Sequence, residues 1–174
     1  MKRRALFGAM GEGCVIERPG PFLWNADRIR LGDRVRIGRE SRLQVNLESG
    51  MGHCGIDLGD DVVIGAGCQF TASLGITIGP GTRIGDEVLI ADNTHRYEDV
   101  STPIPFQTVR PVGAVRIGAN AYIGRGAVIL GGVTIGDGAV IVDRAVVLED
   151  VAPDEWVSGM PTVVLGAPVA THRR

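Results

Sequence analysis

Aromatic side chains, cysteines and long apolar runs are all scarce in this sequence of 174 residues. Phe, Trp and Tyr make up 5% of it, and the cysteines are Cys14, Cys54 and Cys68. Three cysteines without a pairing pattern do not indicate a disulfide framework, so we expect a reduced, cytoplasmic chain. The sequence has no run of about 18 apolar residues, so no membrane-spanning helix is expected.

Charge of either sign is not in large excess. The formal net charge is -2, so no strong field that would attract nucleic acid is expected. Glycine, in contrast, is abundant at 26 residues. This composition disfavours helix bundles and favours many short strands joined by tight corners.

Aliphatic residues recur with a period of six along most of the chain. The longest series is Ile117, Ile123, Ile129, Ile135, Ile141 and Val147, and shorter series are Leu31, Ile37, Leu43; Leu58, Ile64, Phe70; and Ile78, Ile84, Ile90. A second small or apolar residue follows four positions later, as in Val35, Val62, Cys68, Val88, Ala121, Ala127, Val133, Ala139 and Ala145. The residue before it is often one that tolerates the left-handed backbone region: Gly67, Gly81, Asn120, Gly126, Gly132 and Gly138.

A period of six matches neither an α-helix nor a simple alternating strand. It predicts a parallel β-helix in which each hexad is a short strand and a corner, and three hexads close one triangular turn. The aliphatic residues then point into the tube. A β-sandwich with many turns is the alternative, but a sandwich does not hold a fixed period of six.

The period predicts a β-helix over residues 29–152, interrupted by an external loop at about 92–114 that contains Pro103, Pro105 and Pro111. Residues 1–28 lack the repeat and are predicted to form an N-terminal cap or flap, with Phe22 and Trp24 buried or lining a site. Residues 153–174 also leave the repeat and are predicted to form a C-terminal extension.

The repeats at 117–124 and 133–141 resemble the signature of the hexapeptide-repeat acyltransferase family, as does the ending Val157-Ser158-Gly159-Met160-Pro161. The segment at 21–25 and the loop motif Asp92-Asn93-Thr94-His95, followed by Pro103, Ile104 and Gln107, are similar to the maltose, galactoside and exopolysaccharide type of sugar O-acetyltransferase. The resemblance implies a left-handed coil, a homotrimer with active sites between subunits, and acetyl-CoA as co-substrate. It implies no permanently bound cofactor. The acceptor it implies is a sugar hydroxyl, and polysaccharide biosynthesis is the expected setting.

His95 is the candidate catalytic residue. Counting from Ile90, Thr94 takes the inward place, so His95 is expected to face outward. Transfer of an acetyl group to a hydroxyl needs a base, and His is suited to that work near neutral pH. Asp92 and Asn93 are candidate substrate-binding residues that either orient His95 and the acceptor or form an ordinary Asx turn. Trp24 is a third candidate for acceptor binding.

The resemblance places the pantetheine arm of CoA along the C-terminal half, where Arg125, Gly131, Asp143 and Leu148 are the candidate binding residues. Many relatives carry a basic residue shortly after the Gly-x-Pro ending, but this chain reads Thr162-Val163-Val164. Arg125, Arg144, Arg173 and Arg174 are the candidate substitutes for binding the CoA phosphates. Trp156 is expected to cap the last coil or to cover the adenine.

Three other functions stay open at this stage. One is N-acetylation of an amino sugar, and another is a non-catalytic β-helix that acts as an assembly module. The third is a zinc-dependent enzyme like the carbonic anhydrases that share this fold and use three His ligands. The chain has three His residues, His53, His95 and His172, with no close spacing between any two, so no metal site is expected.

Overall fold

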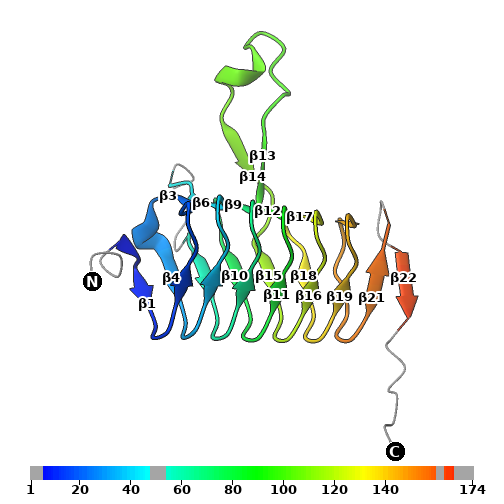
Figure 1. Cartoon of the computed structure of the whole chain (residues 1–174). Helices are drawn as coiled ribbons and strands as arrows, with labels where there is room; N and C mark the ends of the chain where they lie inside the picture. Colours follow the sequence, from blue (N-terminus) through cyan, green and yellow to red (C-terminus); the bar gives the residue numbers. More distant parts are fainter. Residues whose placement is uncertain (1–5, 48–53, 160–162, 167–174) are drawn as a thin grey trace, which may run out of the picture.

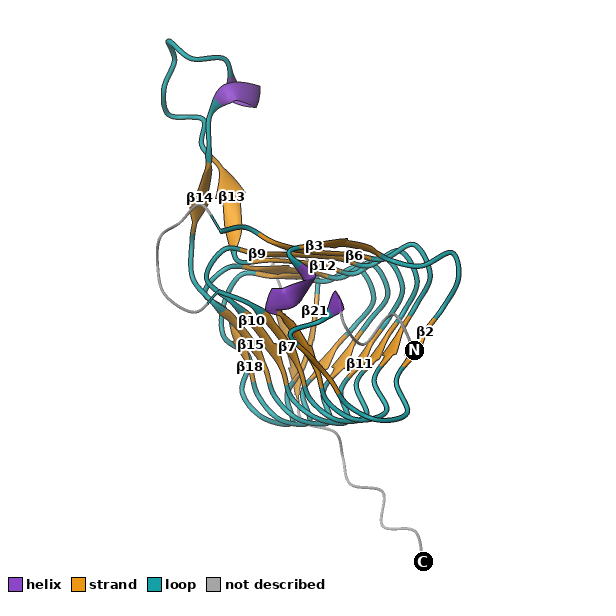
Figure 2. Ribbon diagram, turned by 90° about the vertical axis from the view of Figure 1, so that its left-hand side faces the viewer, coloured by secondary structure: helices purple, strands orange, loops and turns teal. Residues whose placement is uncertain are grey.

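The chain coils into a triangular prism whose three walls are parallel β-sheets. The computed structural model describes residues 6–47, 54–159 and 163–166. Successive coils stack along one axis (Figure 1), and the view along that axis shows three walls meeting at three rows of corners (Figure 2). The predicted left-handed parallel β-helix is confirmed, with each wall built from every third strand of the coil.

The first wall, sheet A, contains six parallel strands. In spatial order these are β1 (Ala9–Met10), β4 (Ile29–Leu31), β7 (Ile56–Leu58), β10 (Ile76–Ile78), β15 (Val115–Ile117) and β18 (Thr134–Ile135).

Sheet B forms the second wall. Its order is β2 (Val15–Ile16), β5 (Arg36–Ile37), β8 (Val63–Ile64), β11 (Arg83–Ile84), β16 (Tyr122–Ile123), β19 (Val140–Ile141), β21 (Trp156–Ser158) and β22 (Val163–Gly166). The last strand, β22, pairs antiparallel with β21 and ends the sheet.

Sheet C forms the third wall and carries the candidate site. Its order is β3 (Phe22–Trp24), β6 (Arg42–Val45), β9 (Gln69–Ala72), β12 (Leu89–Ala91), β17 (Val128–Leu130) and β20 (Val146–Val147). A short 3-10 helix, η2 (Ala26–Arg28), joins β3 to β4. No helix in the described ranges is long and apolar enough to cross a membrane.

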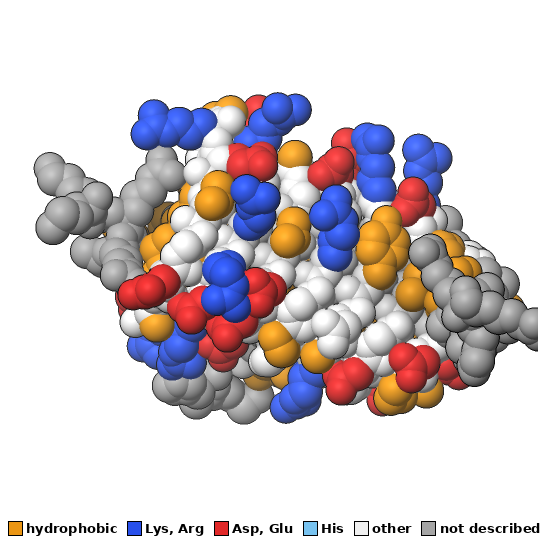
Figure 3. Space-filling model, turned by 60° about the horizontal axis from the view of Figure 1, so that its bottom comes forward, with side chains coloured by type: hydrophobic (Ala, Val, Ile, Leu, Met, Phe, Trp, Pro, Cys, Tyr) orange, Lys and Arg blue, Asp and Glu red, His pale blue; other side chains and the backbone are white. Residues whose placement is uncertain are grey.

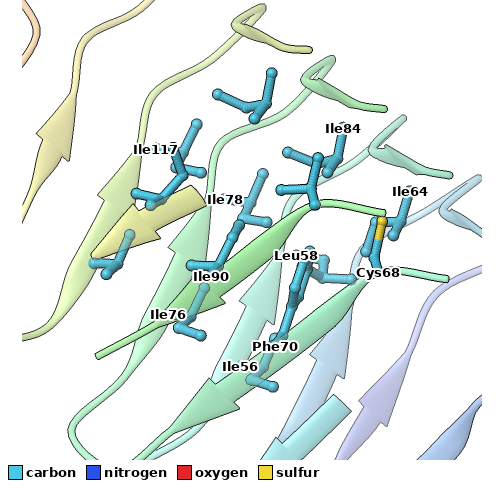
Figure 4. Packing of buried hydrophobic residues seen from close by; sticks show 14 of the residues in the cluster. Ile56, Leu58, Ile64, Cys68, Phe70, Ile76, Ile78, Ile84, Ile90 and Ile117 are labelled. Carbon is cyan, nitrogen blue, oxygen red and sulfur yellow. The ribbon is translucent and has the colours of Figure 1, made fainter. Parts of the chain in front are cut away.

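The interior of the prism is filled by the residues that the period of six selects. Figure 4 shows Ile56, Leu58, Phe70, Ile76, Ile78, Ile84 and Ile90 converging from different walls, with Cys68 among them. Each of these side chains is at most 5% exposed. A buried Ile or Leu contributes on the order of 1.5–3 kcal/mol, so the ladders supply most of the driving force for folding.

The predicted corners are confirmed. Asn120 has φ 53° and Gly67 has φ 67°, and the other four predicted corner residues also have positive φ. Charged residues take the same conformation at further corners, which the rule of Gly or Asn does not foresee: Arg34, Glu40, Asp61, Glu87, Arg144 and Asp154. At one such corner Arg34 donates two hydrogen bonds of 2.7 Å to the Asp61 carboxylate in the next coil.

The coil begins earlier than expected. We expected a cap or flap up to residue 28, but β1, β2 and β3 pair in parallel with β4, β5 and β6 and form a complete first coil. Its partly buried residues that pack against the core are Met10, Ile16 and Leu23, so the spacing is six and then seven. Because of the extra residue, a strict period of six does not detect this coil. Phe22 and Trp24 are not buried, since they are 50% and 55% exposed on the outer face of sheet C.

The coil also extends past residue 152, where we expected an extension. β21 pairs in parallel with β19 and places Val157, which is 3% exposed, in the core. Trp156 on the same strand is 41% exposed and points outward from sheet B. Met160, Pro161, Thr162, Arg173 and Arg174 lie outside the described residues.

Candidate active site

A β-hairpin projects from the prism where the period of six stops. Its strands are β13 (Asn93–His95) and β14 (Val109–Pro111), which pair antiparallel, with His95 opposite Val109. A 3-10 turn, η3 (Ile104–Phe106), lies near its tip. Figure 1 shows the hairpin rising from the row of corners beside β12, well clear of the stacked coils. The predicted external loop at about 92–114 therefore corresponds to this hairpin.

The loop at the end of the hairpin is held by its own polar groups. The Gln107 side chain donates hydrogen bonds to the carbonyls of Asp99 (2.8 Å) and Thr102 (2.7 Å). Hydrogen bonds from Ser101 and Thr102 lower the pKa of the Asp99 carboxyl to about 2. The hairpin is thus an ordered element that can hold a side chain in a fixed place above sheet C.

A groove of about 680 Å³ lies between the hairpin and the outer face of sheet C. Most of its lining residues carry amide, hydroxyl or imidazole groups, one carries a guanidinium, and four are apolar. The residues are Arg42, Gln44, Asn46, Gln69, Thr71, Leu89, Ala91, Asn93, Thr94, His95, Gln107, Thr108, Val109 and Leu130. A groove of this kind suits a ligand with many hydroxyl groups.

His95 lines this groove and is exposed. Within the described part of the chain, no hydrogen bond engages its imidazole ring. The side chain is therefore free to accept a proton from a group bound in the groove. Neither Cys54 nor Cys68 lines the groove, and burial raises the pKa of both thiols to about 11.

The prediction that Thr94 points into the coil is wrong. Asp92 takes the inward place instead, following Val45 and Ala72 of the two preceding coils, and it is 0% exposed. The reason is strand alternation: two residues after the inward Ile90, the side chain faces inward again. The chain then leaves the coil, and Thr94 lies on the hairpin, partly buried at the groove.

The Asp92 carboxylate binds the backbone of the preceding corner. It accepts hydrogen bonds from the N–H groups of Ser73 (2.7 Å), Leu74 (2.6 Å) and Gly75 (2.7 Å). The Asn93 amide donates to Asp92 Oδ1 (2.9 Å) and to the Thr71 carbonyl (3.0 Å). These bonds fasten the base of the hairpin to the coil, and they place neither Asp92 nor its charge against the His95 ring.

Replacing Asp92 with Ala is expected to destabilise the protein by about 3 kcal/mol or more, because three buried or partly buried N–H groups lose their acceptor. For a chain of this size that corresponds to a fall in Tm of roughly 6–12 °C. Thermal unfolding followed by circular dichroism measures the change. Asp137→Ala is the matched control, since Asp137 accepts one exposed bond, from the Ala119 N–H at 2.7 Å. Equal shifts in Tm for the two variants would contradict the anchoring role of Asp92.

The four residues predicted to bind CoA do not lie together. Arg125 and Asp143 lie at the corners between sheets B and C, whereas Gly131 and Leu148 lie at the corners between sheets C and A, on the side of the hairpin. The spacing in the sequence already indicates this division between two rows of corners. In a coil of three hexads, residues 18 apart occupy the same edge, as Arg125 and Asp143 do.

Arg125 is already engaged. Its guanidinium lies 3.0 Å from Glu87 Oε1 and its backbone N–H donates to Asp143 Oδ1 at 2.9 Å. Gly131 lies against the hairpin base, where an added Cβ would come within 3.0 Å of the Asp92 carbonyl. Leu148 is 50% exposed. Of the four, Gly131 and Leu148 are on the edge where the hairpin emerges.

Trp24 lies on sheet C, exposed, but it is not among the residues that line the groove. The groove residues that the sequence analysis missed are the outward-facing ones of sheet C, among them Arg42, Gln44 and Gln69. Each is adjacent to an inward apolar residue, so strand alternation alone could have identified them.

No group of three metal-ligating side chains occurs among the described residues, and His53 and His172 lie outside them. The outer surface away from the hairpin also has a different character from the groove. Figure 3 shows acidic, basic and apolar side chains interspersed over the underside of the prism.

Comparison with known families finds two matches. The model described as "Bacterial transferase hexapeptide (six repeats)" matches residues 114–149, and "Hexapeptide repeat of succinyl-transferase" matches residues 28–72. A comparison with curated proteins found no match.

Solved structures with the same fold include acyltransferases. A variant of AntD, an N-acyltransferase from Bacillus cereus in complex with dTDP-4-amino-4,6-dideoxyglucose and coenzyme A, is 18% identical with a TM-score of 0.81, over 96% of this chain and 87% of that one. The hexapeptide-repeat acetyltransferase VCA0836 from Vibrio cholerae, with acetyl coenzyme A, is 24% identical with a TM-score of 0.62, over 94% and 73%. Another structure of VCA0836 is 27% identical with a TM-score of 0.59, over 94% and 76%.

The coil of hexads and its left hand define a left-handed parallel β-helix, interrupted by the hairpin of β13 and β14. Models of hexapeptide repeats match two stretches of the chain, and solved acyltransferases share its fold, so the chain is similar to the hexapeptide-repeat acyltransferases.

Proposed function

We propose that this protein is an acetyl-CoA-dependent O-acetyltransferase that acts on a hydroxyl of a sugar or saccharide intermediate. The observation that carries the proposal is the exposed imidazole of His95 on the hairpin, beside an amide-rich groove. A match to the model of the hexapeptide repeat of succinyl-transferase, and structural neighbours described with CoA or acetyl-CoA, support the donor.

In the proposed reaction the acceptor lies in the groove with its reacting hydroxyl at His95. The imidazole takes the hydroxyl proton while the oxygen attacks the carbonyl carbon of the acetyl thioester. The C–S bond then breaks, and the proton passes to the sulfur of CoA. The amides of Gln44 and Gln69 and the side-chain oxygen of Asn93 are proposed to bind the other hydroxyls of the acceptor.

The donor arm is proposed to run along the edge where Gly131 and Leu148 lie, since this edge borders the hairpin. Arg125 and Asp143 stay proposed contacts for the distal part of CoA, although Arg125 would have to exchange its pairing with Glu87. We propose a homotrimer in which the donor and the acceptor meet between subunits, and a cytoplasmic location, where acetyl-CoA is available.

Acetylation of an amino sugar is the second candidate, because AntD is described as an N-acyltransferase in complex with an amino sugar nucleotide. The same His95 base would serve an amine. Incubating the protein with acetyl-CoA and paired acceptors, glucose with glucosamine and galactose with galactosamine, and locating the acetyl group by mass spectrometry separates the two. An ester product is expected, and amide formation alone would overturn the O-acetyl assignment.

Binding of acetyl-CoA is the direct test against a non-catalytic module and against a zinc enzyme. In calorimetry we expect saturable binding of one acetyl-CoA per subunit, and in metal analysis we expect less than stoichiometric zinc. A chelator is expected to leave acetyl transfer unchanged. No binding of acetyl-CoA, or activity that disappears with the chelator and returns with zinc, would contradict the proposal.

A further inference from the structure

The outer face of sheet C continues beyond the hairpin toward the first coil in two columns of side chains. Strand pairing aligns Phe22, Arg42, Gln69 and Leu89 in one column. The same pairing aligns Trp24, Gln44, Thr71 and Ala91 in the other. The groove therefore has His95 and the hairpin at one end and Arg42 toward the other, and the exposed rings of Phe22 and Trp24 lie beyond it on the first coil.

Arg42 is the one Lys or Arg side chain among the residues that line the groove. Its guanidinium lies over the Phe22 ring, 4.9 Å from the centroid, and the ion pairs found between described residues do not include it. Stacking on an aromatic ring leaves the N–H edge of a guanidinium free and holds it in one orientation. An exposed, oriented guanidinium in a groove is suited to an anion, above all to a phosphate.

The position of Arg42 sets a length for the ligand. β6, which carries Arg42, is two strands away from β12, after which the hairpin begins. Two steps of the usual strand spacing are about 10 Å along the prism axis. A free monosaccharide at His95 does not bridge that distance, whereas a sugar with a phosphate or diphosphate on its anomeric carbon can.

On the basis of the function proposed above, we infer that the acceptor is a phosphate-bearing sugar whose phosphate group binds Arg42. The reacting hydroxyl lies at His95, the sugar ring lies over Thr71 and Gln69, and the phosphate extends toward the first coil. Trp24, 55% exposed beside this column, offers a flat surface for a group beyond the phosphate.

Binding of two probes, inorganic pyrophosphate and UDP, tests the inference in the presence of saturating CoA, so that the donor site is occupied. Isothermal calorimetry measures both affinities. Trp24 and Trp156 are the two tryptophans of the chain, so in a Trp156→Phe background the remaining fluorescence reports on Trp24. We expect both probes to bind, and Arg42→Gln to weaken each of them by about tenfold or more, as loss of a charged hydrogen-bond partner does.

Arg39→Gln is the matched control. Arg39 is an exposed arginine of the same coil that does not line the groove, and its replacement removes the same charge. We expect affinities within twofold of the parent protein. Equal weakening in both variants, or no binding of either probe to the parent, would overturn the inference. Loss of CoA affinity in Arg42→Gln would also overturn it, because Arg42 would then belong to the donor site.

The two probes also separate the sources of the phosphate. One outcome is that UDP binds more tightly than pyrophosphate, quenches the fluorescence of Trp24, and binds no more tightly than pyrophosphate in Trp24→Ala. In that case the acceptor is a nucleoside diphosphate sugar. Equal affinities identify a phosphate without a base, as in a sugar 1-phosphate or a lipid diphosphate. His95→Ala is expected to bind both probes like the parent. Loss of probe binding in Arg42→Gln therefore tests the phosphate subsite, and loss of acetyl transfer in His95→Ala tests the proposed function.

Discussion

Replacing His95 with Ala is expected to lower the rate of acetyl transfer by about 10²–10⁴-fold, the usual contribution of a general base. The physical reason is that the groove then holds no other group placed to take the proton of the acceptor hydroxyl. Because His95 is exposed on the hairpin and has no hydrogen-bond partner among the described residues, its loss should change neither Tm nor acetyl-CoA affinity. Release of free CoA measures the rate, and calorimetry measures the affinity.

Arg96→Gln controls for a change on the same hairpin. Arg96 follows His95, its backbone N–H donates to the Thr108 carbonyl at 3.1 Å, and its side chain does not line the groove. We expect transfer within about twofold of the parent, as for other exposed substitutions away from the site. If His95→Ala folds, binds acetyl-CoA and transfers acetyl groups at a near-normal rate, the general-base role is wrong.

Replacing Ile123 with Asp is expected to prevent folding. Ile123 is 0% exposed and lies between Ile84 and Ile141 in the ladder of sheet B. A carboxylate there loses its hydration and has no partner, which costs several kcal/mol in addition to the lost burial. That penalty is comparable to the whole stability of about 5–15 kcal/mol that a folded domain has. Soluble expression and the β-sheet circular dichroism signal should both be lost.

Tyr122→Asp is the control on the same strand. Tyr122 points outward and is 39% exposed, so a carboxylate at this position stays hydrated. This variant is expected to express in soluble form and to keep its β-sheet signal. An Ile123→Asp protein that stays soluble with an unchanged Tm would show that the ladder residues do not point into the prism.

Much of the fold was predictable because a coil repeats one physical solution. Ile84, Ile123 and Ile141 occupy equivalent places, so a period of six in the sequence becomes a stacked ladder in space. The handedness of the coil was not predictable in the same way. Parallel crossovers are right-handed as a general rule, so the left hand came from the resemblance to a family and not from the residues.

The places where prediction failed have local causes. The first coil was missed because one extra residue separates Ile16 from Leu23, which breaks a strict count of six. Asp92 was expected near the catalytic residue, but strand alternation turns it inward, where backbone N–H groups of the preceding corner bind it. The sequence alone contains no signal for that pairing, because it joins residues in different coils.

The candidate site was predictable at His95 and much less so for the donor. A histidine next to a break in the period must lie near a coil edge, and the structure places it on the groove. The CoA residues were chosen by resemblance, and they divide between two edges of sheet C. Arg42 was not singled out, because its role depends on Phe22 and on the distance to the hairpin, which only the stacked coils define.

A crystal structure of the protein with CoA is the most direct test of the central claim, that an imidazole on the hairpin acts on a thioester held beside it. The account predicts that the CoA sulfur lies next to the groove at the His95 end. One acceptor hydroxyl should then fit within about 3 Å of the imidazole and about 3.5 Å of the thioester carbon. A CoA sulfur that lies on another wall of the prism, out of reach of His95 of any subunit, would contradict the account.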